Sequence, residues 1–67
     1  MDLRKRLARN LVALRHARGW SQEDLADVAE LHRTYVSGIE RQVRNPTLDI
    51  LERLAKAFKI TAGELLG

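Results

Sequence analysis

With 67 residues, the chain has room for one small domain, spanning residues 1–67, in which a deep catalytic cleft is not expected. The lack of cysteine excludes disulfides and cysteine-bound metals. A composition with 45% hydrophobic but only 4% aromatic residues favours an aliphatic core between helices. No apolar run approaches the roughly 18 residues of a membrane span. The net charge is +3, but residues 1–20 and 32–48 are basic around an acidic segment, which indicates a basic face of the kind that binds nucleic acid, although a merely solvated surface carries the same charges.

Residues 3–17 are predicted to form the first helix, because apolar side chains recur there every three or four positions. The expected buried face comprises Leu3, Leu7, Leu11, Leu14 and Ala17. Gly19 favours the end of this helix, since glycine readily adopts the left-handed conformation that closes many helices.

A second helix is predicted over residues 21–30. Ser21 is a natural N-cap, and Asp24 three residues later completes a capping box. A third helix is expected over residues 33–41, with Val36 and Ile39 facing inward. Its outer face would carry arginine, threonine, serine and glycine side chains.

Thr47 follows the single proline and is expected to cap a fourth helix. The buried face of that helix would comprise Leu48, Leu51, Leu54, Ala55 and Phe58. A fifth, short helix is predicted to begin at Thr61, where Glu64 completes a second capping box. No segment alternates like a strand, so the predicted class is all-α with five helices.

Two short helices joined by a tight turn, the second with exposed polar side chains, form a helix-turn-helix, which places its second helix in the major groove of DNA. From about residue 7 to residue 66, the sequence resembles the phage-repressor and Cro type of this domain (the XRE family) in "WSQEDLA", "YVSGIERQVRNPTLDILERLAKAF" and "ITAGELL". Within that family, "HRTYVSGIER" resembles the controller proteins of restriction-modification systems, which are dimeric regulators of their own operon. The resemblance implies a compact, lambda-repressor-like fold and a homodimer that binds double-stranded DNA. The lack of cysteine and of a signal-peptide core is compatible with a cytoplasmic protein, and no cofactor is expected.

The resemblance assigns base reading to the third helix, through Arg33, Thr34, Ser37 and Gly38. The chemistry agrees, because arginine can bind guanine with two hydrogen bonds, and threonine offers a hydroxyl and a methyl group. Gly38 would let backbone and base approach closely; alternatively, it only tolerates a tight neighbour.

Phosphate contacts are assigned by the same resemblance to Gln22, Tyr35, Arg41, Arg44 and Asn45. Gln22 would also brace the third helix. Tyr35 either stacks on the DNA or, as we expect, packs beside the first helix with its hydroxyl near the DNA backbone. A dimer interface is expected at Ile50, Ala62 and Leu65, since relatives pair through this end of the domain and Ile50 lies off the apolar face of its helix.

The sequence departs from the family pattern at three positions. Glu30 and Gln42 stand where the family often has glycine, and a left-handed backbone there would cost roughly 1 kcal/mol. His32 replaces the usual Ser, Thr or Asp cap of the third helix, so that cap is expected to be weak.

An enzyme is not expected. Glu40 has no paired acid, and a structural bond to an arginine or to the backbone is the preferred interpretation. His16 and His32 lack the spacing of a metal site, and no small-molecule pocket is evident. The alternatives to a transcriptional regulator are an antitoxin-like protein that binds a toxin and controls its operon, and the DNA-binding part of a larger regulator.

Overall fold

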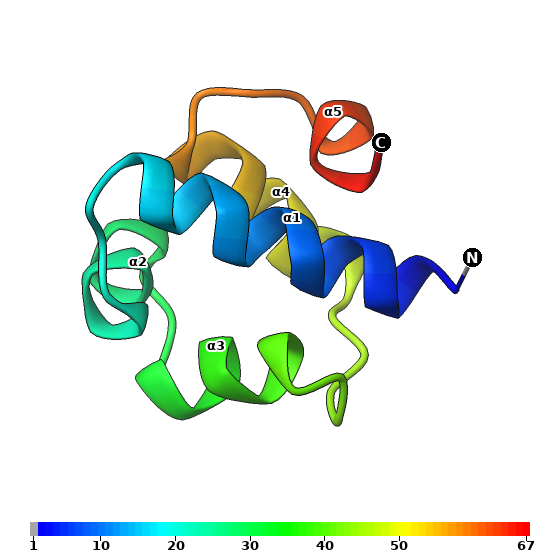
Figure 1. Cartoon of the computed structure of the whole chain (residues 1–67), viewed down its shortest axis with the longest axis horizontal. Helices are drawn as coiled ribbons and strands as arrows, with labels where there is room; N and C mark the ends of the chain where they lie inside the picture. The colour runs from blue at the N-terminus through cyan, green and yellow to red at the C-terminus, as the bar shows by residue number, and fades with distance from the viewer. Residues whose placement is uncertain (1) are drawn as a thin grey trace.

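Five helices make up the described part of the chain, residues 2–67 of this computed structural model (Figure 1). They are α1 (Leu3–Ala17), α2 (Gln22–Ala29), α3 (Arg33–Glu40), α4 (Leu48–Ala57) and α5 (Ala62–Leu66). No strand occurs in these residues, so the all-α, five-helix prediction is confirmed. Each predicted boundary lies within about one residue of the observed one.

The helices begin where short polar side chains can accept hydrogen bonds from the first turn. Both predicted capping boxes form, at Ser21 with Asp24 and at Thr61 with Glu64. Thr47 accepts from the Ile50 N–H at the start of α4. His32 makes no side-chain cap bond at the start of α3, as its chemistry predicts.

Four helices end in the same left-handed turn. The turn residues are Gly19 (φ 68°), Glu30 (φ 58°), Gln42 (φ 63°) and Lys59 (φ 58°). In each case the next residue donates its N–H to a carbonyl five positions earlier, the bond that defines a Schellman motif. This geometry was anticipated from the family pattern at Glu30 and Gln42, but not at Lys59.

The core lies where all five helices meet. Its fully buried large side chains are Leu11, Leu25, Val36, Ile39, Leu54, Phe58 and Leu65. Three predicted core residues are wrong: Leu3 is 59% exposed, Leu48 is 79% exposed, and Ala17 is exposed as well. Leu3 and Leu48 lie in the first turn of their helices, where nothing in the described chain covers the apolar face, and Ala17 lies in the last turn of α1.

The only tryptophan, Trp20, closes the space between the connection after α1 and the end of α4. Its ring stacks on Phe58 with centroids 5.4 Å apart. The Arg18 guanidinium lies over both rings, and its Nη2 donates to the Phe58 carbonyl at 2.7 Å. These contacts bury aromatic surface that neither helix covers alone.

Helix α3 lies at one edge of the molecule, on the opposite side of α1 from α5 (Figure 1). It packs against α1 and α2, while α4 packs against α2 and α5. No other helix lies beyond α3 in Figure 1, so its outer face is left uncovered. This face defines the candidate site.

Candidate nucleic-acid interface

The inner side of α3 is anchored in the core by Val36 and Ile39, both almost completely buried, as predicted. The opposite side carries the exposed Arg33 and Thr34. Because inner and outer residues alternate with helical spacing, the core fixes which side chains α3 presents outward. α3 therefore presents hydrogen-bond donors on a surface that nothing in the described chain covers.

The end of the same face is basic. Arg41 is exposed, and its Nε donates to the half-buried Ser37 Oγ at 3.2 Å. Beyond it, the loop before α4 exposes Arg44 and Asn45. The structure thus brings the predicted base-reading and phosphate-binding side chains of α3 and its loop into one continuous region.

Tyr35 is half-buried and packs against the core. Above that ring lies the Arg44 guanidinium, whose central carbon is 5.6 Å from the ring centroid. This cation-π contact joins α3 to the loop that follows it.

The position of Gly38 differs from the prediction. Gly38 was expected on the outer face of its helix, open to the duplex, but it is buried in the structure. A Cβ at this position would lie 2.5 Å from the Arg44 Cγ, because the Arg44 side chain lies across the glycine. The tight-neighbour alternative is therefore the one that the geometry supports.

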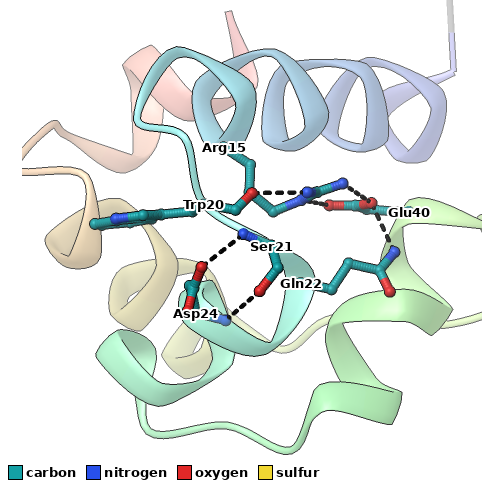
Figure 2. A network of polar contacts seen from close by, with 6 residues as sticks. All are labelled: Arg15, Trp20, Ser21, Gln22, Asp24 and Glu40. Carbon is teal, nitrogen blue, oxygen red and sulfur yellow. Dashed lines mark hydrogen bonds and ion pairs between the residues drawn. The ribbon is translucent and has the colours of Figure 1, made fainter.

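A polar network holds α3 from behind, and Figure 2 shows its members. Arg15 on α1 donates through Nε to Glu40 Oε2 at 2.8 Å and through Nη2 to Glu40 Oε1 at 3.0 Å. Its Nη1 donates to the Trp20 carbonyl at 2.9 Å. Gln22 Nε2 donates to Glu40 Oε1 at 2.9 Å. One carboxylate thus joins α1, α2 and α3.

The ion pair in this network is largely buried, with the Arg15 and Glu40 side chains 12% and 6% exposed. The hydrogen bonds with Glu40 raise the pKa of Arg15 above its ordinary value, so the arginine stays charged. Among residues 2–67, no buried side-chain nitrogen or oxygen lacks a partner. The predicted structural role of Glu40 is therefore confirmed.

Gln22 contacts Glu40 at the end of α3, as expected for a residue that braces this helix. Its amide nitrogen uses one N–H on Glu40 and has a second to offer. Arg15, the other member of this network, was not predicted from the sequence. The only signal was a base on the inner side of the first helix, since Arg15 and Glu40 are 25 residues apart.

The three residues predicted at a dimer interface differ in their exposure. Ile50 and Ala62 are half-buried and keep exposed surface, but Leu65 is 0% exposed and belongs to the core of its own chain. Leu65 fills the core because α5 turns its apolar side onto α1, where Asn10 Nδ2 donates to the Leu65 carbonyl at 2.7 Å. Leu3 and Leu48, which were expected in the core, are exposed apolar side chains instead.

Two general findings bear on the class of protein. Within residues 2–67, no group of three or more histidine, cysteine, aspartate or glutamate side chains could hold a metal ion. Nor is any helix in this part of the chain both long and apolar enough to cross a bilayer.

Comparison with known proteins identifies the class. A family profile described as helix-turn-helix matches residues 11–65. The chain therefore belongs to the helix-turn-helix family of DNA-binding transcription regulators, and the resemblance to the phage-repressor and Cro type is confirmed.

Individual relatives narrow this class. The chain is 44% identical over 66 residues to the control protein C.SmaI of Serratia marcescens, covering 98% of this chain and 79% of that protein. The restriction-modification controller protein C.AhdI from Aeromonas hydrophila superposes with a TM-score of 0.87 at 42% identity, over 92% of this chain and 94% of that one. A hypothetical transcription factor from Neisseria, NHTF, superposes with a TM-score of 0.94 at 45% identity, over 98% of this chain and 76% of that one. The similarity to controller proteins is thus confirmed.

Proposed function

We propose that the protein is a homodimeric regulator of transcription that binds DNA sequence-specifically. The observation that carries the proposal is the outer face of α3. It exposes Arg33 and Thr34, continues into the basic loop at Arg44, and is held from behind by the buried Arg15 and Glu40 pair. A rigid helix with exposed donors suits the major groove.

The candidate site residues fall into two groups, those proposed to contact bases and those proposed to contact phosphates. Arg33, Thr34 and Ser37 face outward on successive turns of α3 and are proposed to read base edges. Contacts to phosphate, which hold the protein in register without reading sequence, are proposed for Gln22, Tyr35, Arg41, Arg44 and Asn45. Glu40 takes no part in binding, because its oxygens are already engaged.

Dimerisation is part of the proposal because one small domain can contact only a few bases. One α3 offers few base contacts, whereas two copies about 34 Å apart would read two half-sites of a near-palindrome. Ile50 and Ala62 are proposed at the interface, together with the exposed Leu48. Operation in the cytoplasm is part of this proposal and agrees with a chain that has no cysteine.

The decisive experiment is selection of bound duplexes from a random DNA library at fixed, near-physiological salt. Recovery of a near-palindrome with half-sites about one helical turn apart is the expected result. Folded protein that recovers no motif would refute sequence-specific recognition and favour a partner-binding role.

The dimer is tested separately by sedimentation equilibrium. Leu48→Lys should shift the protein to monomer while leaving its folding intact, because this side chain is exposed in the single chain. Val28→Lys, an exposed apolar position on α2, is the matched control. An unchanged monomer-dimer equilibrium in Leu48→Lys would exclude this surface.

A further inference from the structure

The loop after α3 folds back onto the helix it follows. Gln42 adopts the left-handed conformation and donates its N–H to the Ile39 carbonyl at 3.0 Å. Val43 then donates to the Gly38 carbonyl at 2.9 Å. This turn fixes the backbone direction just before Arg44 and returns the chain toward residue 38.

The Arg44 side chain occupies the space that a side chain at residue 38 would need. A Cβ on Gly38 would lie 2.5 Å from Arg44 Cγ, 3.5 Å from Nε and 3.6 Å from Cβ. The Cγ is the second carbon of the side chain, so it can move away only if the whole side chain rotates about its first bond. Alanine at residue 38 and the observed Arg44 conformation therefore exclude each other.

Tyr35 contacts the charged end of the same Arg44 side chain. It lies three residues before Gly38, so both belong to one side of α3. The Arg44 guanidinium lies over the Tyr35 ring at 5.6 Å, within the range of a cation-π contact. The glycine thus accommodates the stem of the arginine and the ring supports its charged end.

We propose that Gly38 is a positioning residue for Arg44, and that Gly38 and Tyr35 together form a seat that holds the arginine side chain across α3 before DNA binds. This inference rests on the proposed function, in which Arg44 binds a phosphate. Holding the side chain in place beforehand reduces the ordering that binding would otherwise require. In this proposal, the absence of a side chain at Gly38 makes room for Arg44 rather than for the duplex.

The first test needs no DNA. In the wild-type protein, the ring of Tyr35 should shift the NMR signals of the Arg44 side-chain protons upfield. Gly38→Ala and Tyr35→Leu should each abolish that shift. Gly63→Ala is the matched control, because a Cβ there meets only Thr61 Oγ1 at 3.8 Å, an ordinary contact. An Arg44 shift that persists in Gly38→Ala would overturn the proposal.

The second test is a double-mutant cycle on a mixed-sequence 30-base-pair duplex, a probe that suffices because phosphate contacts do not depend on sequence. Gly38→Ala should weaken binding about as much as Arg44→Ala and lower the salt slope by about one. In the Arg44→Ala background, Gly38→Ala should add nothing. Equal losses in both backgrounds would overturn the proposal, because Gly38 would then act on DNA without Arg44.

The two tests separate this inference from the function on which it rests. If the wild-type protein binds no duplex at low salt, the proposed function fails. If the wild type binds and the NMR shift is absent, only the seat for Arg44 fails. Gly38→Ala should remain folded, since alanine favours a helix more than glycine does, and its circular dichroism spectrum verifies this.

Discussion

Arg15 and Glu40 form a two-bonded ion pair that joins α1 to the end of α3, with Nε 2.8 Å from Oε2 and Nη2 3.0 Å from Oε1. The pair lies on the inner side of the helix whose outer side carries the candidate base-reading residues. The same ion pair therefore affects the stability of the fold and fixes how α3 is oriented against α1.

Removing one partner of this pair should be strongly destabilising. Arg15→Met leaves the Glu40 carboxylate buried without its cation, which should lower the free energy of unfolding by ~3–5 kcal/mol. The double variant Arg15→Met with Glu40→Leu should recover much of that loss, because no buried charge remains. Urea unfolding of both variants measures this. A double variant no more stable than Arg15→Met would show that the ion pair itself stabilises the fold.

Arg33 and Arg44 should differ in how they affect DNA binding. Arg33→Ala should weaken binding to the selected operator by about 1–3 kcal/mol and leave a scrambled duplex nearly unaffected. Arg44→Ala should weaken binding to both duplexes and reduce the salt slope by about one. Titrations on both duplexes at several salt concentrations separate the two effects. Equal losses on both duplexes for Arg33→Ala would rule out its base-reading role.

The left-handed turn at Gln42 offers a route to greater stability. A non-glycine residue in this conformation costs roughly 1–2 kcal/mol, whereas glycine loses about 0.4–1 kcal/mol more through chain entropy on folding. Gln42→Gly should therefore stabilise the protein by up to about 1 kcal/mol, as thermal unfolding would show. The control Glu52→Gly, in the exposed part of α4, should destabilise by about 1 kcal/mol. Destabilisation by Gln42→Gly would contradict the strain at this turn.

Glu64 should contribute to the pH dependence of stability. Hydrogen bonds from Thr61, chiefly from its backbone N–H, lower the pKa of Glu64 below its ordinary value of 4.5. A lowered pKa in the folded state stabilises the protein above pH 4.5, and this contribution disappears as the pH falls through the folded-state pKa. Glu64→Gln should flatten the acid side of the stability curve. Glu52→Gln, also exposed, is the control, and identical curves for both variants would argue against the assignment.

Local chemistry explains what could be predicted from the sequence. The capping boxes at Ser21 and Thr61 depend on side chains three residues apart, and the periodic apolar residues fix which face of each helix turns inward. Helical periodicity therefore placed Val36 and Ile39 in the core and Arg33 and Thr34 on the outer face of α3.

What could not be predicted depends on contacts between distant or non-helical segments. The periodicity of α1 includes Leu3 and that of α4 includes Leu48, but no period shows where the covering elements end. Leu65 is buried because α5 folds back onto α1. Gly38 is covered by a side chain from a loop, and loops have no periodicity from which a side chain can be placed.

The stacking of Trp20 on Phe58 gives the molecule a built-in optical probe. All tryptophan emission comes from this one site, where the connection after α1 meets the end of α4. Its ring points away from Glu40 and the end of α3 (Figure 2). Fluorescence should therefore follow loss of tertiary structure without any label.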